Sequence, residues 1–106
     1  MRIAITAQGK ELTAPVDPRF GRCSFFILWD SVTQQYTAYA NENATSSGAG
    51  ISSAQFVINK GAQAVITGET GPRAAQVLQS AGVKVHMTTA KTVQEVVEEF
   101  QKGGSV

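Results

Sequence analysis

The chain has 106 residues, of which 42% are hydrophobic and 16% charged, and its formal net charge is +1. This length predicts a single domain over residues 1–106 that buries a core of its own. The near balance of charge argues against a general nucleic-acid binder and against a binder of anionic membranes, since both need a basic surface. One cysteine cannot form an internal disulfide. The short apolar stretch at the N-terminus predicts neither a signal peptide nor a membrane span, so we expect a cytoplasmic protein.

The first half of the chain predicts three strands. Residues 2–7 form a short apolar run, and residues 23–30 are apolar at both parities, as in a strand that is covered on both faces. A short turn separates this second run from residues 35–40, which carry two tyrosines, so the two strands form a hairpin. A long polar segment, 8–22, follows the first strand, and a loop rich in Ser, Gly and Asn, 41–50, follows the third.

The second half alternates three helices with two short strands. Apolar residues recur at helical spacing from Ile51, from Pro72 and after Thr92, and a glycine ends each predicted helix. These glycines, Gly61, Gly82 and Gly103, are separated by equal intervals of 21 residues. The strands are residues 64–67 and 83–87. Units of equal length indicate successive right-handed crossovers in a parallel sheet.

Together the elements predict an α/β fold in the order β-β-β-α-β-α-β-α, with a five-stranded mixed sheet flanked by three helices. If the first strand pairs in parallel with the fourth, only the second strand runs against the others. The loops 8–23, 41–50, 68–72 and 88–91 then gather at one edge, where open α/β sheets bind ligands. We expect residues 102–106 to form a frayed tail.

The first candidate site is the segment from Asp17 to Cys23, with the sequence Asp-Pro-Arg-Phe-Gly-Arg-Cys. The guanidinium groups of Arg19 and Arg22 suit bidentate contact with a multiply charged anion. Cationic neighbours also lower the pKa of a thiol, and the thiolate is the form that binds metal. The alternative is that Asp-Pro starts a turn, Phe20 fills the edge of the core, the arginines form surface pairs and Cys23 is a small buried apolar residue.

Two glycine-rich turns precede predicted helices at the same edge of the sheet. Ser46-Ser47-Gly48-Ala49-Gly50 opens the first helix, and Gly68-Glu69-Thr70-Gly71-Pro72-Arg73 opens the second. Free N–H groups at a helix N-terminus favour an anion, and glycine lets a ligand approach the backbone closely. Taken singly, the first turn is also explained as a flexible loop with a serine N-cap, and the second as a tight crossover. Together with the Arg/Cys loop they predict a shallow pocket for an anion.

Catalytic chemistry has little support in the sequence. The one histidine, His86, alternates with Val85 and Met87 in an edge strand, where we expect a surface residue rather than a base. One Cys and one His cannot supply the roughly four ligands of a zinc site. The carboxylates are too scattered for a two-metal nuclease. We therefore predict that the protein is not an enzyme.

A series of motifs runs in order along nearly the whole chain: Asp-Pro-Arg-Phe-Gly-Arg-Cys, a Phe-rich strand, Gly-Ala-Gly-Ile, Val-Ile-Thr-Gly-x-x-Gly-Pro, Ala-Gly-Val-Lys-Val and Thr-Val-x-Glu. This series resembles the dinitrogenase iron–molybdenum cofactor biosynthesis family, which includes NifX, the C-terminal part of NifB and the orange-protein type. The resemblance implies a ribonuclease-H-like fold. It also implies a non-catalytic carrier or scaffold for an anionic metal–sulfur cluster or its precursor.

The cargo implied by the resemblance is an iron–molybdenum–sulfur or molybdenum–copper–sulfide cluster, and the protein can also be isolated in an apo form. Cluster-assembly proteins or an ATPase are the implied partners. NifX-like members carry a His directly before Phe-Gly, where this chain has Arg19, so Cys23 is the one candidate metal ligand. The candidate cluster-binding residues are Arg19, Phe20, Gly21, Arg22, Cys23, Gly48, Ala49, Gly50, Gly68, Gly71, Pro72 and Arg73.

The alternative function is a protein-interaction or regulatory module that serves a cluster-assembly ATPase and binds no metal itself. Such a module would show an exposed apolar patch, for example around Phe20 or the tyrosines of the third strand.

Overall fold

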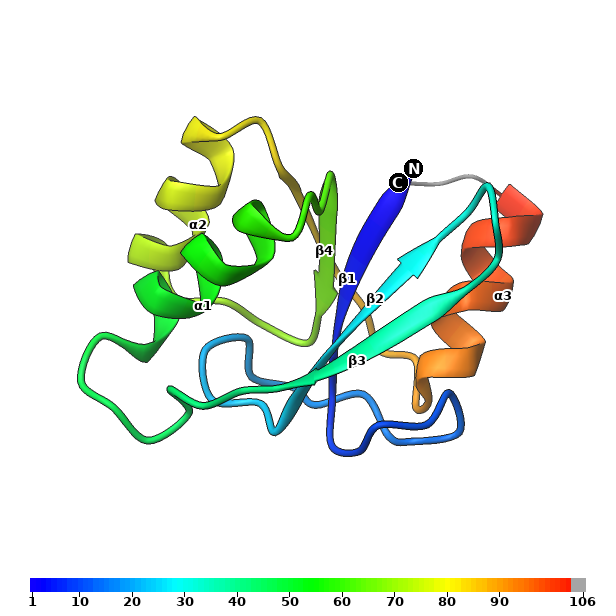
Figure 1. The fold of residues 1–106 in the computed structure, drawn as a ribbon, viewed down its shortest axis with the longest axis horizontal. Helices are drawn as coiled ribbons and strands as arrows, with labels where there is room; N and C mark the ends of the chain where they lie inside the picture. The colour runs from blue at the N-terminus through cyan, green and yellow to red at the C-terminus, as the bar shows by residue number, and fades with distance from the viewer. Residues whose placement is uncertain (104–106) are drawn as a thin grey trace.

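The elements follow the predicted order along the chain (Figure 1). The computed structural model describes residues 1–103. The strands and helices are β1 (Arg2–Ala7), β2 (Phe25–Asp30), β3 (Tyr36–Ala40), α1 (Ala49–Asn59), β4 (Ala64–Thr67), α2 (Pro72–Ser80), β5 (Lys84–Met87) and α3 (Val93–Gly103). Within the described range, no helix has both the length and the apolar character needed to cross a membrane.

Several element boundaries differ from the prediction by one or two residues. Strand β2 begins at Phe25 rather than at residue 23, β3 begins at Tyr36 rather than at residue 35, and β5 begins at Lys84 rather than at residue 83. Helix α1 begins at Ala49, and its N-cap is Gly48 in the left-handed region (φ 75°) rather than a serine, so the predicted serine cap is wrong. Helix α3 includes residues 102 and 103, which the sequence predicted to be frayed; residues 104–106 of that tail lie outside the described part of the chain.

The sheet has the strand order β3-β2-β1-β4-β5. Strand β1 pairs in parallel with β4 and antiparallel with β2, β3 pairs antiparallel with β2, and β5 pairs in parallel with β4. As predicted, β2 alone runs against the other four strands. The carboxyl ends of β1, β3, β4 and β5 therefore meet at one edge of the sheet, together with the loops that follow them.

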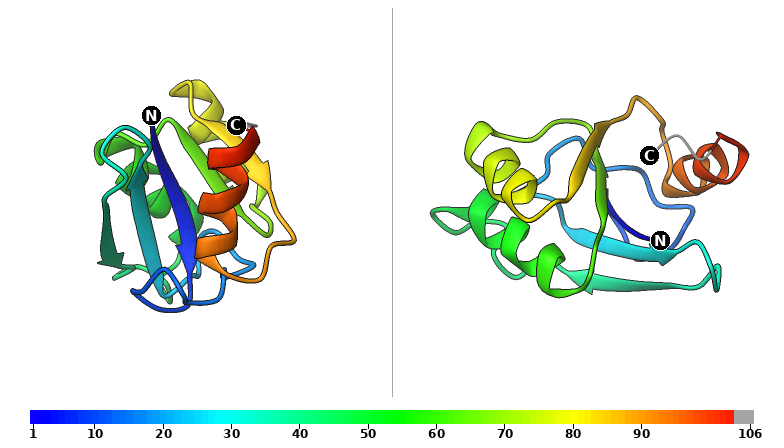
Figure 2. Two further views of the ribbon diagram at one scale, coloured as in Figure 1. Left: turned by 90° about the vertical axis from the view of Figure 1, so that its right-hand side faces the viewer. Right: turned by 90° about the horizontal axis from the view of Figure 1, so that it is seen from above.

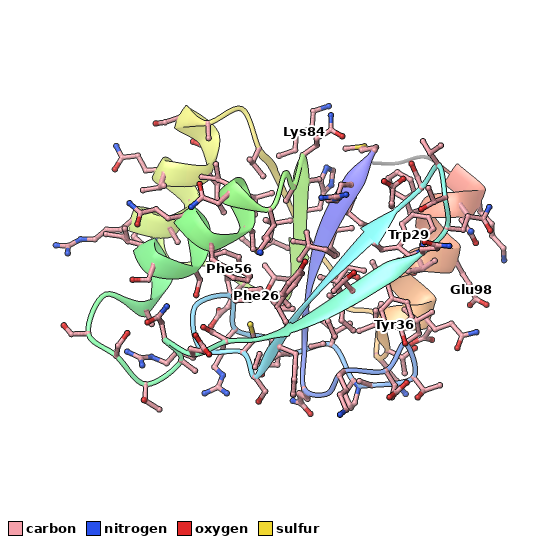
Figure 3. All side chains as sticks on the ribbon, viewed as in Figure 1. Phe26, Trp29, Tyr36, Phe56, Lys84 and Glu98 are labelled. Carbon is pink, nitrogen blue, oxygen red and sulfur yellow. The ribbon has the colours of Figure 1, made fainter. Side chains whose placement is uncertain are left out.

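Helices cover both faces of the sheet, with α1 and α2 on one side and α3 on the other (Figures 1 and 2). This arrangement explains the apolar run in β2. Its alternate residues Phe26 and Leu28 enter the core beneath α1 and α2, whereas Ile27 and Trp29 enter the core beneath α3. Figure 3 shows Phe26 beside Phe56 of α1, and Trp29 on the side of α3.

Helix α3 is fixed at its start and near its end. The predicted capping box is present: the N–H of Glu95 donates to Thr92 Oγ1 (3.2 Å), and the N–H of Thr92 donates to Glu95 Oε1 (2.9 Å). The N–H groups of Thr92 and Lys91, which both donate to the Glu95 carboxylate, hold the pKa of Glu95 below its ordinary value. Further along, the ring of Phe100 meets Trp29 edge-on, with a centroid separation of 5.6 Å.

The core beneath α2 gives a test of this packing. Leu78 is fully buried there, so Leu78→Ala is expected to lower the free energy of unfolding by about 2–5 kcal/mol through lost burial and a residual cavity. Urea denaturation followed by circular dichroism measures the loss. Val32 is 82% exposed, and Val32→Ala should change stability by no more than about 0.5 kcal/mol. Equal losses in the two variants would contradict the placement of the core.

Candidate functional site

The segment 17–23 docks between the turn after β4 and the start of α1. The N–H of Phe20 donates to the carbonyl of Glu69 (3.1 Å), and the N–H of Glu69 donates to the carbonyl of Pro18 (2.7 Å). This pair of hydrogen bonds forms a short parallel bridge that continues β4 past its end. Loops from distant parts of the sequence are thereby joined at the predicted edge.

Glycine makes this docking possible at two points. A Cβ on Gly68 would lie 2.6 Å from Pro18 Cα, and a Cβ on Gly21 would lie 2.8 Å from both the Cα and the N of Gly50. Contacts this short leave no room for any other residue. The backbone of the segment therefore lies directly against the β4–α2 turn on one side and the first turn of α1 on the other.

A buried polar group anchors the start of the segment. The carboxylate of Asp17 accepts the N–H of Arg19 (2.9 Å), and the Arg19 side chain lies 3.5 Å from the same oxygen. The Thr6 hydroxyl donates to the carbonyl of Asp17 (2.7 Å) and lies 2.8 Å from the Thr67 hydroxyl. Threonines at the ends of β1 and β4 thus fix the point where the segment leaves the sheet.

The three arginines of the predicted site have different surroundings. Arg19 is exposed over 59% of its side chain and pairs with Asp17. Arg22 donates from Nη1 to the carbonyl of Ala44 (2.9 Å) and so ties segment 17–23 to the loop before α1. Arg73 is exposed in the first turn of α2 and lines a cavity. Of the three, Arg73 is the one that lines this cavity.

The cavity has a volume of about 360 Å³ and lies between the N-termini of α1 and α2. Its lining consists of Gly21, Gly48, Gly50, Ile51, Gly71, Pro72, Arg73 and Ala74. The structure thus brings together six of the predicted residues, one from segment 17–23 and the others from the two glycine-rich turns. The remaining candidates do not line the cavity: Arg19, Phe20, Arg22, Cys23, Ala49 and Gly68. Ile51 and Ala74 were missed as site residues, because the helical periodicity of the sequence assigned their apolar side chains to the core.

Both helices present unpaired N–H groups to this cavity. Neither N-cap, Gly48 or Gly71, provides a side-chain hydrogen bond, and neither helix has an acidic residue in its first turn. The first-turn N–H groups have no acceptor within a helix. Among the residues that line the cavity, these groups belong to Gly50, Ile51, Arg73 and Ala74. The N–H of Glu69, in the second glycine-rich turn, is not free for an anion, because it donates to the carbonyl of Pro18.

Two positive helix ends and a cation therefore converge without a compensating acid. A cation in the first turn of a helix is unfavourable next to the positive end of the helix dipole. Arg73 occupies this position, and Gly50 lies so close to Ala74 that a Cβ on it would be 3.4 Å from the Ala74 Cβ. The two N-termini are thus adjacent, and a bound anion would relieve the repulsion among them.

Cys23 has the opposite electrostatic setting to the predicted one. Its thiol is fully buried in the core beneath α1 and α2, and burial, together with the nearby Asp17 carboxylate, raises its pKa from 9.0 to about 12. The prediction of a lowered pKa is wrong, because Arg19 pairs with Asp17 and Arg22 reaches Ala44. The assignment of Cys23 to a metal stays a prediction, and a protonated buried thiol does not favour it.

Asn41 holds this part of the segment in place, although nothing in the sequence drew attention to it. Its Nδ2 donates to the carbonyls of Gly21 (3.0 Å) and Cys23 (2.9 Å) and lies 3.9 Å from the Cys23 sulfur. An Asn at the end of a strand in a polar loop is too common to predict such a role. Within residues 1–103, no three His, Cys, Asp or Glu side chains gather as a metal site.

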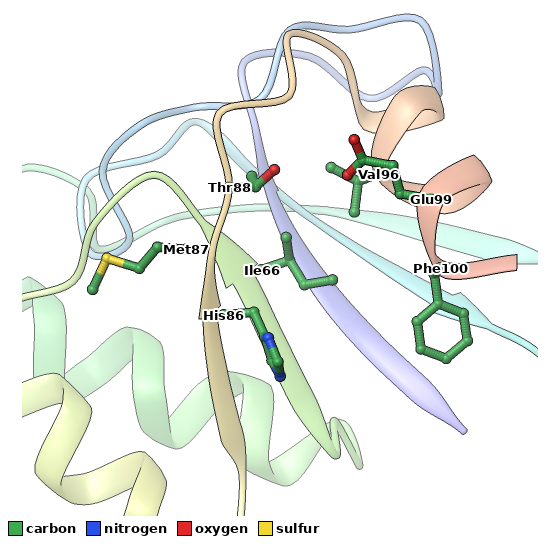
Figure 4. Close-up of a pocket in the computed structure, with 7 residues that line it drawn as sticks. All are labelled: Ile66, His86, Met87, Thr88, Val96, Glu99 and Phe100. Carbon is green, nitrogen blue, oxygen red and sulfur yellow. The ribbon is translucent and has the colours of Figure 1, made fainter. Parts of the chain in front are cut away.

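A second cavity, of about 100 Å³, lies on the α3 face of the sheet beside His86 (Figure 4). Its other lining residues include Ile66, Glu99 and Phe100. Figure 4 shows the His86 ring and the Glu99 carboxylate at different ends of this cavity. Cys23 belongs to the core on the other face. The sheet therefore separates the one thiol from the one imidazole, and the two do not form a dyad.

Comparison with known proteins identifies the family of this architecture. The family described as dinitrogenase iron–molybdenum cofactor matches residues 1–103. The chain belongs to this family. Among solved structures, this chain is similar to the apo form of the orange protein from Desulfovibrio gigas, with a TM-score of 0.90 and 43% sequence identity. The match covers 96% of this chain and 88% of that one.

Two further relatives extend the comparison. A putative NifB protein from Thermotoga is 34% identical, with a TM-score of 0.85, and the match covers 96% of this chain and 88% of that one. An uncharacterized protein of Methanocaldococcus jannaschii is 27% identical over 107 residues, or 97% of this chain and 87% of that protein. The family resemblance and the ribonuclease-H-like fold expected from the motifs are thus confirmed.

The glycine contacts predict unequal effects of alanine at three positions. Gly21→Ala and Gly68→Ala are each expected to lower the free energy of unfolding by about 1–3 kcal/mol, because the new Cβ overlaps backbone atoms that cannot move away freely. Gly71→Ala is the control: its φ is −70° and no atom lies within 4 Å of the added Cβ. Chemical denaturation of the three variants measures the difference. A loss in Gly71→Ala as large as in Gly68→Ala would contradict the docking.

The setting of Cys23 predicts a dependence of stability on alkaline pH. The unfolded thiol loses its proton near pH 9.0, whereas the folded thiol, with a pKa of about 12, retains it. The folded state therefore binds more protons in this window, and the Cys23 contribution to stability should fall from pH 9 toward pH 12 by up to about 1.4 kcal/mol per unit. The measurement is the difference between the wild type and Cys23→Ala in urea denaturation at several pH values. A difference that grows in favour of the wild type as the pH rises would show a stabilised thiolate instead.

Proposed function

We propose that the protein is a non-catalytic carrier or scaffold that holds an anionic metal–sulfur cluster, or its precursor, in the cavity between the N-termini of α1 and α2. The observation that carries this proposal is the convergence of two uncapped helix N-termini and Arg73 on one cavity with no acidic residue in either first turn. Such a site attracts negative charge through backbone N–H groups, the helix dipoles and a guanidinium.

The lining of the cavity suits a cluster better than a strongly hydrated oxyanion. Ile51, Pro72 and Ala74 contribute apolar surface next to the N–H groups. An anion that enters must shed water against these side chains, and sulfide ligands, being polarisable and weakly hydrated, lose less on doing so than phosphate-type oxygens. The family description names the iron–molybdenum cofactor, and an iron–molybdenum–sulfur or a molybdenum–copper–sulfide cluster is the cargo that we propose.

The donor set favours capture of a whole anionic cluster over ligation of a bare metal ion. The cavity offers N–H groups and Arg73, which are hydrogen-bond donors, and no Cys, His, Asp or Glu is among the described residues that line it. Cys23, the one ligand that the sequence suggested, is buried in the core and protonated at neutral pH. We therefore propose that the metals arrive already coordinated by sulfur and that the protein holds the cluster by charge and hydrogen bonds.

The alternative, an interaction module without cargo, has less support. Phe20 is 2% exposed and fills the core, so it cannot form the surface patch that this alternative suggested, and the tyrosines of β3, Tyr36 and Tyr39, are half-buried against the core clusters. Among the described residues, the exposed large apolar side chains are Val32 and Met87, which lie at opposite edges of the sheet. Cluster-assembly proteins or an ATPase remain the proposed partners of the loaded carrier.

Anaerobic incubation with tetrathiomolybdate, with and without copper(I), followed by desalting, tests the proposal. The wild type is expected to retain a chromophore in a stoichiometric amount. Arg73→Ala should weaken retention by about 10-fold or more, as expected for the loss of a hydrogen bond to a charged group. Arg19→Ala should have a smaller effect, since Arg19 pairs with Asp17, and Cys23→Ser should retain the chromophore.

Lys84→Ala is the matched control, because it removes an exposed cation on β5, outside the cavity. Absence of a retained chromophore in the wild type would contradict cargo binding. Equal losses in Arg73→Ala and Lys84→Ala would contradict the proposed position of the site.

A further inference from the structure

Strand β3 forms one edge of the sheet, and within residues 1–103 no further strand or helix lies beyond it (Figure 2). Its five residues, Tyr-Thr-Ala-Tyr-Ala, pair continuously with β2 from Tyr36↔Trp29 to Ala40↔Phe25. Exposed edges are usually protected from further pairing by a charged residue, a proline or a bulge. Strand β3 has none of these, so its outer side is a template for another strand.

The hydrogen-bond pattern identifies the free backbone groups. The carbonyl of Gln35 accepts from Asp30 (2.9 Å), and the N–H of Asn41 donates to Ser24 (2.9 Å). In an antiparallel pair, alternate residues bond to the partner strand. The odd-numbered residues of β3 therefore bond to β2, whereas Tyr36, Ala38 and Ala40 direct their N–H and C=O groups outward.

The opposite edge of the sheet is protected. Strand β5 has four residues, begins at the exposed Lys84 and includes His86. Its Lys84 N–H donates to Gln63 and the Thr88 N–H donates to Thr67, so the groups of Val85 and Met87 alone face outward. Strand β5 is therefore the poorer template for a further strand, because it is shorter and carries a charged residue, whereas β3 is the better one.

We propose that two copies of this chain associate through β3, antiparallel, about a two-fold axis at Ala38. In this register Tyr36 lies opposite Ala40 of the second copy, and Ala38 lies opposite its own counterpart. All outward N–H and C=O groups of both strands are then paired, and the two sheets become one continuous sheet. A shift of two residues in either direction leaves Tyr36 or Ala40 without a strand partner.

The side chains are self-complementary in this register. The large Tyr36 faces the small Ala40, and Ala38 faces Ala38 at the axis. Thr37 faces Tyr39, a pairing of a β-branched with an aromatic side chain that stabilises antiparallel strands. Strand β3 itself carries no charged residue; the charged side chains beside its tyrosines come from other elements, with Lys60 Nζ 4.6 Å from the centre of the Tyr39 ring and Glu11 Oε2 3.5 Å from the Tyr36 hydroxyl.

This association is independent of the proposed function. None of the residues that line the anion cavity belongs to β3. The contact joins two short strands, so it buries less than the roughly 1,600 Å² of a standard interface, and a reversible dimer that depends on concentration is expected.

Sedimentation of the wild type from about 10 μM to about 1 mM tests the association, since weak interfaces dissociate in this range. A monomer at low and a dimer at high concentration is expected. Over the same range, amide hydrogen exchange should slow at Tyr36, Ala38 and Ala40 but not at Val85 and Met87. A monomer throughout would overturn the proposal, as would protection on β5, or protection on β3 that appears only when another protein is added.

Charge exchange at the axis tests the register. Ala38→Lys and Ala38→Glu should each weaken self-association by at least about 10-fold relative to the wild type, because like charges directly opposite each other repel. An equimolar mixture of the two variants should restore a dimer. Met87→Lys, on the other edge, is the control and should dimerise as the wild type does. Circular dichroism checks that each variant is folded. If Ala38→Lys still dimerises, or if the mixture of the two variants stays monomeric, the two-fold register is overturned.

Discussion

The close approach of backbone to backbone at Gly21 and Gly68 is the constraint on which the site depends. Gly21 of segment 17–23 lies against Gly50 in the first turn of α1, and Pro18 of the segment lies against Gly68 in the turn after β4. Neither Gly21 nor Gly68 has room for a side chain. Because of these contacts, a segment that follows β1 becomes the link between two loops from later in the chain. The N-termini of α1 and α2 then face one cavity.

The polar groups of the segment serve this docking more than they serve a ligand. Asp17 is buried and satisfied by Arg19, and Asn41 spans the carbonyls of Gly21 and Cys23. Arg22 reaches across to Ala44. What the docked segment leaves open is backbone: the first turns of two helices, with Arg73 beside them. An anion site made of N–H groups needs little sequence beyond glycines that let a ligand approach.

The buried thiol illustrates how proximity in sequence can mislead about electrostatics. Cys23 follows Arg22 directly and lies four residues from Arg19, yet its pKa is raised rather than lowered. The long arginine side chains extend away from the thiol, to the Asp17 carboxylate and to the Ala44 carbonyl, whereas the short cysteine side chain enters the core. Charge acts through distance and through the surrounding medium, and neither can be obtained from spacing along the chain.

Local patterns in the sequence determined the order of the elements, the capping box at Thr92, the two-sided burial of β2 and the family. These features depend on periodicity and on short-range hydrogen bonds, which neighbouring residues control. Only the tertiary structure decided which of the candidates face the cavity. It separated Arg73, Gly48, Gly50, Gly71 and Pro72 from Phe20, Arg22 and Cys23, because the positions of these residues are set by contacts between segments that lie about 30 to 50 residues apart in the chain. Which backbone groups of β3 are free likewise depends on the register of its pairing with β2. A sequence pattern indicates that the two strands pair, but it does not determine the register.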